Sequence, residues 1–461
     1  MSIAGAFIVP HPPIILPQVG HGEEEKIRKT IDAYEKVARR IAALKPEVII
    51  LTSPHTTLYA DYFHISPGKG AKGDLRKFGA SGFSVEVEYD SELVQAISEE
   101  AENAGIHAGT MGEREKVLDH GTLIPLYFIN QFYKDYRLIR IGLSGLNPLE
   151  HYRFGTLIAR VVERLGRKAV FVASGDLSHK LLEEGPYGFV PDGPEFDMKV
   201  TEAMEKADFL AFLSFQQSFC DSAAECGLRS FIIMAGALDG KAVMPELLSY
   251  EGTFGVGYGV ASFEVTGEDP NRKFDEIFIS REQERLSGIK SKEDAYVKLA
   301  RLSLETFVKT GEMAALPDNL PNEMLTRRAG VFVSLKKHGH LRGCIGTISP
   351  VTKSIAQEIL RNAVSAGTED PRFPEVTKSE LPELVYSVDV LSEAEPIQSM
   401  DELDVKRYGV IVTNGHRRGL LLPNLETIDT PRQQVEIALE KAGIRPGQPY
   451  SMERFEVVRH K

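Results

Sequence analysis

Apolar residues along the first 265 positions fall into two patterns. In one pattern, short runs rich in branched residues stand together, which predicts strands buried on both faces. These runs occupy residues 3–9, 48–51, 138–143 and 168–172. In the other pattern, apolar residues recur every three or four positions over residues 23–44 and 148–165, as in helices that pack one face on a core. Strands that alternate with such helices predict an α/β domain over residues 1–266, with a mostly parallel sheet flanked by helices.

The pattern changes after residue 266. Residues 267–292 are polar and interrupted by glycine and proline, which is typical of a linker. Residues 293–461 combine helical stretches with strands, among them a hairpin whose turn runs from Lys337 to His340. This combination predicts a second, smaller α+β domain.

Composition narrows the classes of function. The 461 residues carry a net charge of −12, which argues against a nucleic-acid partner. The longest apolar runs have the length of strands, so we expect no membrane span, and the N-terminus lacks the features of a signal peptide. Cys220, Cys226 and Cys344 have no metal-knuckle spacing, which favours a reducing compartment. We therefore expect a cytoplasmic protein that acts on small molecules.

Four histidines of the first domain stand beside the ends of apolar segments. His11 follows the first predicted strand and precedes two prolines, which restrict its direction. His55 follows the second strand, His179 lies a few residues past the strand at 168–172, and His120 precedes a further apolar stretch. Ligands in parallel sheets collect at the carboxyl ends of the strands, so we expect these side chains to converge. The alternative is that they are unrelated core or surface histidines.

A carboxylate can join the histidines from a later segment. The pattern over residues 222–234 predicts a helix in which Glu225 shares one face with Leu228 and Ile232 and points inward. Cys226 then points in a more polar direction. Two histidines and one carboxylate with open positions form the ligand set of non-haem Fe(II) sites that activate oxygen. An unliganded histidine near the open positions is a suitable acid or base.

Five short motifs follow one another through the first domain. They are His11-Pro12-Pro13, Ser53-Pro54-His55, Asp119-His120-Gly121, Ser174-Gly175-Asp176-Leu177-Ser178-His179 and Glu225-Cys226-Gly227. Together they resemble the class III extradiol ring-cleaving dioxygenase catalytic-subunit family, whose superfamily also contains the Memo proteins. The resemblance covers about residues 1–265 and implies that His11, His55 and Glu225 hold Fe(II). It also implies that His179 is the acid or base and that His120 lines the pocket.

Two further residues, Asp176 and Cys226, each have two alternative interpretations. Asp176 either orients His179 or is an ordinary turn residue. Cys226 is either a packed thiol or the late metal ligand, because the Memo branch has a cysteine at that position. The inward face predicted for Glu225 favours the carboxylate as the ligand.

Three motifs of the second domain resemble the AMMECR1 domain, over about residues 293–461. They occupy residues 341–347, 370–374 and 419–423. Arg342 and Cys344 alternate onto one face of a strand, and a thiolate near an arginine is stabilised. Cys344 is therefore either a reactive thiol or a buried structural cysteine.

The fusion of these two halves resembles the combined A and B components of the AmmeMemoRadiSam system, which implies a radical S-adenosylmethionine enzyme as partner. Three scattered cysteines do not supply the Fe–S motif of such an enzyme in this chain. The leading expectation is an Fe(II)-dependent oxygenase that uses O₂ to cleave the ring of a dihydroxy-aromatic or similar chelating substrate. The alternatives are an iron- or copper-binding scaffold or sensor that serves the radical enzyme, and a metal-dependent hydrolase.

Overall fold

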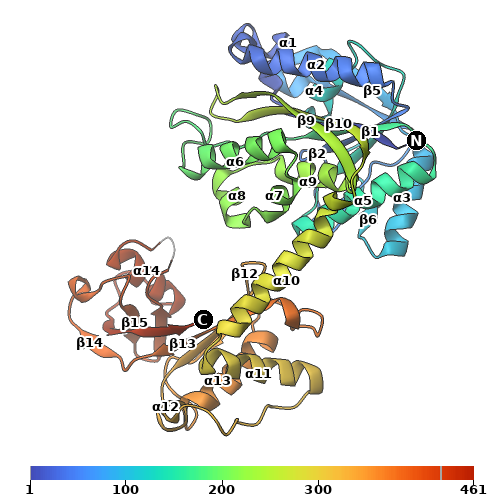
Figure 1. Cartoon of the computed structure of the whole chain (residues 1–461). Helices are drawn as coiled ribbons and strands as arrows, with labels where there is room; N and C mark the ends of the chain where they lie inside the picture. Colours follow the sequence, from blue (N-terminus) through green and yellow to red (C-terminus); the bar gives the residue numbers. More distant parts are fainter. Residues whose placement is uncertain (1, 426–427) are drawn as a thin grey trace. The chain divides into compact units, whose positions relative to one another are not determined.

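The computed structural model describes residues 2–425 and 428–461, in two compact units, Met1–Arg281 and Glu282–Lys461 (Figure 1). The division falls within α10 (Phe274–Lys292), so most of the range expected as a linker is helical. Acidic residues in the first turn of α10 and lysines in its last turn suit the helix dipole. None of its residues, all of which the structure describes, is buried, which explains its polar composition.

The N-terminal unit is built on one six-stranded sheet in the order β7-β2-β8-β1-β10-β9. The first four strands in this order are parallel to one another, whereas β10 pairs antiparallel with β1 and β9 pairs antiparallel with β10. The bounds are β1 Ile3–Val9, β2 Val48–Ser53, β7 Arg137–Gly142, β8 Ala169–Ser174, β9 Lys241–Glu251 and β10 Tyr258–Glu268. The predicted mostly parallel sheet is confirmed, and β2, β8 and β1 end at the same edge.

Helices cover both faces of this sheet. Alternate residues of the central strands enter two separate apolar cores, which is why their sequences need not alternate in polarity. One core contains α2 (Arg28–Leu44), α4 (His120–Ile129) and the hairpin of β4 (Gly70–Leu75) and β5 (Ala80–Glu88). The other contains α3 (Ser91–Ala104), α5 (Pro148–Arg164), α6 (Asp192–Lys206), α7 (Phe209–Ser214), α8 (Gln217–Ala223) and α9 (Leu228–Ala237). Shorter elements are α1 (Pro17–Gly20), β3 (Phe63–His64) and β6 (Ala108–Gly109).

The C-terminal unit contains two four-stranded sheets, in the orders β12-β11-β13-β18 and β14-β17-β15-β16. The first sheet comprises β11 (Val331–Lys337), β12 (His340–Gly346), β13 (Leu384–Leu391) and β18 (Val457–His460). The second comprises β14 (Glu395–Ile397), β15 (Gly409–Asn414), β16 (Arg417–Leu421) and β17 (Ser451–Phe455). The helices are α11 (Ala295–Thr310), α12 (Asn322–Thr326), α13 (Ile355–Thr368) and α14 (Pro431–Lys441).

Two packing relations build this second unit. Helices α11 and α13 share an apolar core with the inward residues of β11 and β13, and α14 covers the second sheet. The predicted α+β architecture is confirmed. The hairpin turn lies where the sequence predicts it, since His338 and Gly339 adopt the left-handed conformation between β11 and β12.

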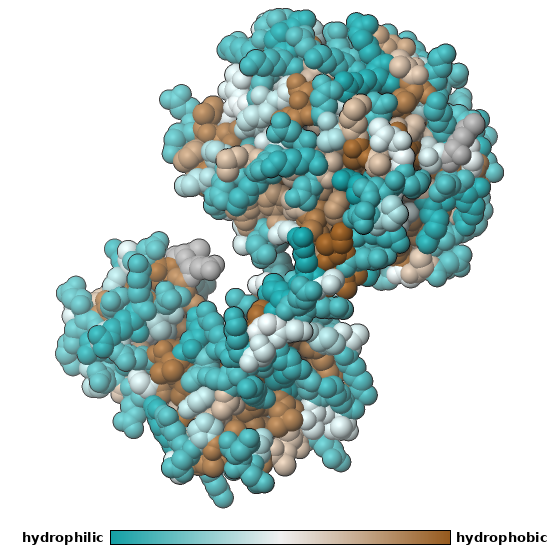
Figure 2. Space-filling model, in the orientation of Figure 1, coloured by the Kyte–Doolittle hydropathy of each residue, from teal (hydrophilic) through white to brown (hydrophobic). Residues whose placement is uncertain are grey.

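Hydrophilic side chains cover most of the visible face of each unit (Figure 2). Within residues 2–425 and 428–461, no helix has the length and apolar character needed to cross a bilayer.

Candidate metal centre

The carboxyl edge of the sheet brings three histidine rings together. His11 and His55 each lie two residues beyond their strands, β1 and β2, and His120 is the first residue of α4. The ring centroids of His11 and His55 are 4.7 Å apart, and those of His55 and His120 are 4.0 Å apart. The Nε2 atoms of His11 and His55 approach to 2.9 Å. The convergence expected from the strand ends is therefore present for these three residues.

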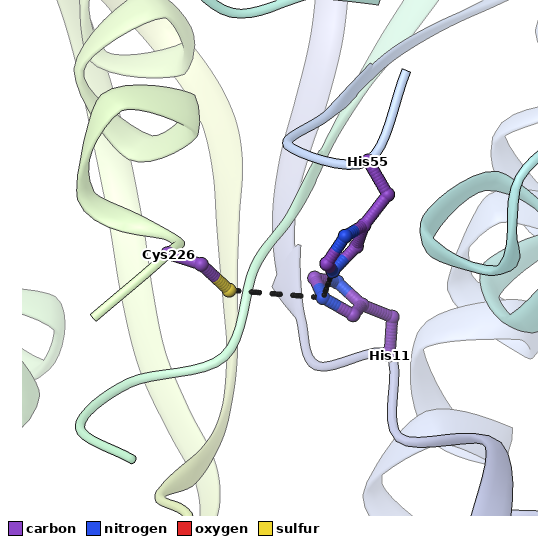
Figure 3. Close-up of side chains that lie close together, drawn as sticks. All are labelled: His11, His55 and Cys226. Carbon is purple, nitrogen blue, oxygen red and sulfur yellow. Dashed lines mark hydrogen bonds between the residues drawn. The ribbon is translucent and has the colours of Figure 1, made fainter. Parts of the chain in front are cut away.

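A thiol completes the group. Cys226 reaches the two histidines from the segment before α9, and its Sγ lies 3.7 Å from His11 Nε2 (Figure 3). The donor atoms of His11, His55 and Cys226 lie within 4.8 Å of one another, and Asp176, His179 and Cys226 form a second such group. Cys226 thus belongs to both groups of donor atoms.

Glu225, the expected carboxylate ligand, does not join this group. The helix predicted over 222–234 is interrupted, because α8 ends at Ala223 and Ala224 adopts a left-handed conformation with φ of 52°. Residues 224–227 are consequently not helical, so the facing argument does not apply. The carboxylate of Glu225 instead accepts a hydrogen bond of 2.7 Å from the backbone N–H of Leu228, at the start of α9. Burial raises the pKa of Glu225 to about 7.

A close approach of two glycines places Cys226. A Cβ atom on Gly175 would lie 2.1 Å from the Cα atom of Gly227, so only glycine allows the two segments to touch here. Beside this contact, the backbone N–H of Asp176 donates to Cys226 Sγ at 3.3 Å. The motif of 174–179 and the motif of 225–227 are therefore one structural unit.

Hydrogen bonds determine which imidazole nitrogens face the centre. Ser174 Oγ donates its only proton to the carbonyl oxygen of Gly121 at 2.6 Å, so it accepts from His11 Nδ1 at 2.9 Å. His179 Nδ1 lies 2.6 Å from the carbonyl oxygen of Ala224, which only accepts. In the neutral form both histidines therefore carry the proton on Nδ1. Their Nε2 lone pairs are left for a ligand or a proton.

The site favours neutral imidazoles. Burial, and then the neighbouring His55 and His120, lower the pKa of His11 well below its usual value of 6.5. Burial also lowers the pKa of His55, and burial followed by the effect of His55 lowers the pKa of His120 to about 4. Burial and the charge of Asp176 raise the pKa of the Cys226 thiol well above its usual value. A bound cation suits the neutral imidazoles, but it opposes the raised pKa of the thiol, because a metal-bound thiol loses its proton.

Asp176 lies between His11 and His179. One carboxylate oxygen accepts from the backbone N–H of His11 at 2.8 Å. The other lies 3.9 Å from His11 Nε2 and 4.0 Å from His179 Nε2. The arrangement allows Asp176 to stabilise a proton on His179. Because Asp176 also accepts from the backbone of His11, it helps to hold the loop that follows β1.

A buried ion pair supports His55 and His120 from one side. Asp119 caps α4 by accepting from the backbone N–H of Thr122 at 3.1 Å, and it also accepts from Ser53 Oγ at 2.5 Å. Arg140 of β7, which is fully buried, lies 3.3 Å from the same carboxylate. Burial opposes ionisation of Asp119, but Arg140 and these hydrogen bonds outweigh it and lower the pKa. The signal for Arg140 in the sequence is a charged residue inside the apolar run of residues 138–143.

Comparisons with known proteins agree with this architecture. A family model described as the catalytic LigB subunit of aromatic ring-opening dioxygenase matches residues 5–261, more than half of the chain. The chain belongs to the LigB family. A second family model, AMMECR1, matches residues 297–460 of this LigB-family protein, so the predicted fusion of the two domains is confirmed.

The relatives match either the whole chain or about one third of it. Protein CA_C1420 of Clostridium acetobutylicum is 46% identical over the full length of both chains. A protein of Thermotoga maritima is 47% identical over 171 residues, which cover 37% of this chain and 98% of that one. The crystal structure of protein PH0010 from Pyrococcus horikoshii is 30% identical over 36% of this chain and 88% of that one, with a TM-score of 0.34. The full-length match indicates that the two domains also occur together in protein CA_C1420.

Proposed function

We propose that the N-terminal unit is a metal-dependent oxygenase that holds a transition metal through His11, His55 and Cys226. The observation that carries this proposal is the convergence of two imidazole Nε2 atoms and a buried thiol at the carboxyl edge of the sheet. Membership of the LigB family supports Fe(II), and a thiolate in the ligand set also suits copper. The substrate is a dihydroxy-aromatic or similar chelating compound, cleaved with O₂ in the extradiol manner.

The residues around the donors have distinct tasks in this proposal. A bound metal supplies the redox chemistry and the positions at which a diol and O₂ are held. His179 has an unprotonated Nε2 and a partly exposed side chain, so it accepts a proton from a substrate hydroxyl. The carboxylate of Asp176, 4.0 Å from that nitrogen, stabilises the resulting imidazolium. His120 stays neutral at pH 7 and lines the pocket with Phe78, whose ring centroid lies 5.2 Å away.

Cys226 favours a second candidate function. A soft thiolate in the place of a carboxylate is the kind of ligand that selects Cu(I). A copper- or iron-binding scaffold that delivers metal to a partner, such as the radical S-adenosylmethionine enzyme predicted from the fusion, would use the same three side chains without turnover. Metal binding alone does not separate the two candidates, whereas O₂ consumption does.

The test begins with metal analysis of protein purified without oxygen. The variants are His11→Ala and Cys226→Ser, with Glu225→Gln as a matched control because Glu225 adjoins Cys226 but bonds to α9. We expect about one metal ion per chain in the wild type and the control, and a loss of about 100-fold or more in affinity in the other two variants. Metal lost in Glu225→Gln and kept in Cys226→Ser would reverse the ligand assignment.

Oxygen uptake with a panel of catechols then separates the functions. Uptake that requires the metal and His179 supports the oxygenase. Tight Cu(I) binding with no uptake favours the scaffold. Turnover without oxygen in the Zn²⁺-loaded protein indicates the third alternative, a hydrolase.

A further inference from the structure

A second group of buried polar side chains lies on the side of the metal centre where Arg140 supports Asp119. An antiparallel bridge joins Ile65 to Ile141, and the backbone N–H of Ser66 donates to the carbonyl oxygen of Arg140 at 2.9 Å. Residues opposite each other in such a pair point to the same side. Since Ile65 and Ile141 both enter the core on the α5 side, Ser66 and Arg140 both point to the opposite side.

His64 belongs to the same side. It precedes Ser66 by two residues, so in extended backbone the two side chains share a face. Its carbonyl oxygen lies beside Gly142, two residues beyond Arg140, and the charge of Arg140 acts on its ring. The side chains of His64, Ser66 and Arg140 thus form one group, which we call the Arg140 cluster.

The Arg140 cluster is buried and incompletely hydrogen-bonded. His64 and Ser66 are each 1% exposed, and Arg140 is 0% exposed. Among the described residues, neither ring nitrogen of His64, nor Ser66 Oγ, nor Arg140 Nε has a hydrogen-bond partner. The hydroxyl of Thr57, on the chain segment beside Gly142, is likewise without one. Buried polar groups are costly without partners, so several of them in one place indicate a ligand.

The available groups are donors. Arg140 offers Nε–H, Ser66 offers its hydroxyl proton, and neutral His64 offers one ring N–H. The other guanidinium nitrogens are already engaged with Thr56 Oγ1 at 3.0 Å, with Asp119 at 3.3 Å and with the carbonyl oxygen of Glu115 at 3.4 Å. A ligand that accepts several hydrogen bonds and carries negative charge matches this set, whereas a cation does not. We propose that the Arg140 cluster is a binding site for a small anion of the carboxylate type.

Asp119 neutralises the charge of Arg140 only in part. Its carboxylate also accepts from Ser53 and Thr122, so its negative charge is shared among several donors. The Nε–H of the guanidinium has no acceptor among the described residues. Burial, and then the charge of Arg140, lower the pKa of His64, which keeps the imidazole neutral and able to donate one proton.

The site adjoins the metal centre and is covered. Arg140 contacts Thr56, which follows His55, and Asp119, which precedes His120, so it holds the chain neighbours of two of the centre's histidines. The segment around Gly112 and Glu115 lies beside it, because Tyr59 OH donates to the carbonyl oxygen of Gly112 and Arg140 donates to the carbonyl oxygen of Glu115. The anion comes from one of two sources: it is a free small carboxylate, or it is a carboxylate group of a substrate. Only the second source rests on the proposed oxygenase function.

Binding of free anions is tested on the full-length protein without added metal. Formate and acetate are titrated, with neutral acetamide as the isostere, and thermal unfolding and the ring signals of His64 are followed. We expect both anions to raise the unfolding temperature and to shift the His64 signals, and acetamide to do neither. No response to either anion means that only water completes these groups, and this would overturn the proposal.

Ser66→Ala identifies the site. Its hydroxyl has no partner within the described residues, so its removal does not lower the stability of the protein without anion. We expect the variant to bind formate about tenfold or more weakly, because one hydrogen bond to a charged group is lost. Ser249→Ala, which removes another unpartnered buried hydroxyl on β9, is the matched control and keeps wild-type affinity. Equal affinity in all three proteins would place the anion elsewhere and overturn the assignment.

The source of the carboxylate is resolved in metal-loaded protein. A catechol that carries a ring carboxylate is compared with catechol itself in O₂ uptake. A KM raised by Ser66→Ala for the carboxylated compound alone identifies a substrate carboxylate. KM values that Ser66→Ala leaves unchanged, together with formate binding that depends on Ser66, identify a free anion. Formate binding that depends on Ser66 without any O₂ uptake would contradict the oxygenase function and still support the anion site.

Discussion

Cys226 in the N-terminal unit and Cys344 in the C-terminal unit are both partly buried thiols among charged or ionisable side chains, but their surroundings differ. Around Cys226, the imidazole nitrogens of His11, His55 and His179 and the carboxylate of Asp176 lie close to the thiol. Around Cys344, each arginine is already paired in two-point contacts with a carboxylate. The pairs are Arg342–Glu380, Arg372–Asp370 and Arg459–Asp389.

This difference separates a binding site from a structural one. The ligand atoms around Cys226 lie close enough together to hold one cation, whereas the charges around Cys344 are balanced within the protein. Cys344 itself accepts a hydrogen bond of 3.2 Å from Ser334, and its backbone N–H donates to Asp370 at 2.8 Å. Nothing in this arrangement calls for a ligand, so the structural interpretation of Cys344 is the simpler one.

The largest expected effect comes from breaking an ion pair in each region. Arg140→Met leaves Asp119 charged and buried, and we expect the free energy of unfolding of the N-terminal unit to fall by about 3–5 kcal/mol. Arg372→Met removes a side chain that is 54% exposed, and we expect a loss of only about 1 kcal/mol from the C-terminal unit. Denaturant unfolding followed by probes in each unit measures both changes. Equal losses would contradict the distinction between the two regions.

The two regions also respond to acid over different pH ranges. The pKa of His120 is about 4 in the folded protein and 6.5 without structure, so the unfolded chain takes up the proton first as the pH falls. Its contribution is fully present above pH 6.5 and is lost towards pH 4, by at most about 3 kcal/mol. The difference in unfolding free energy between the metal-free wild type and His120→Asn should follow this range. A difference independent of pH would mean that His120 is not buried as described.

In the C-terminal unit, Glu380 is the titratable group to compare with His120. Burial opposes its ionisation, but Arg342 outweighs burial and lowers the pKa to about 2, from 4.5 without structure. Its contribution is present above pH 4.5 and is lost only as the pH falls towards 2. The stability difference between the wild type and Glu380→Gln should therefore be constant between pH 4.5 and 6.5, where that of His120→Asn changes.

The smallest expected effect comes from removing one hydroxyl in each of the two regions. Ser174→Ala removes the acceptor that keeps the proton of His11 on Nδ1, and we expect metal affinity to fall about tenfold. Ser334→Ala removes the hydroxyl that donates to Cys344, and we expect no change in metal affinity. Competition with a chelating dye measures both. Unchanged affinity in Ser174→Ala would show that this hydrogen bond does not orient His11.

Much of this architecture is predictable from local patterns. The strands and their order along the chain follow from short apolar runs, and the histidines are recognisable because they stand just past those runs. The choice between Glu225 and Cys226 is not predictable in this way. It depends on a left-handed residue at Ala224, which ends the helical periodicity on which the prediction relied. The Arg140 cluster was missed because it forms only when residues 64–66 pair with β7.

The amino-acid sequence alone determined the two-domain composition, the mostly parallel sheet and the histidines at its carboxyl edge, because these depend on periodicity and on residues close together in the chain. The tertiary structure decided which donor atoms meet, since Cys226 and His11 are 215 positions apart. It also decided the proton position on His11, through Ser174 and Gly121, and the burial of His64 against Arg140. Such contacts depend on how distant segments pack, and no local pattern encodes them.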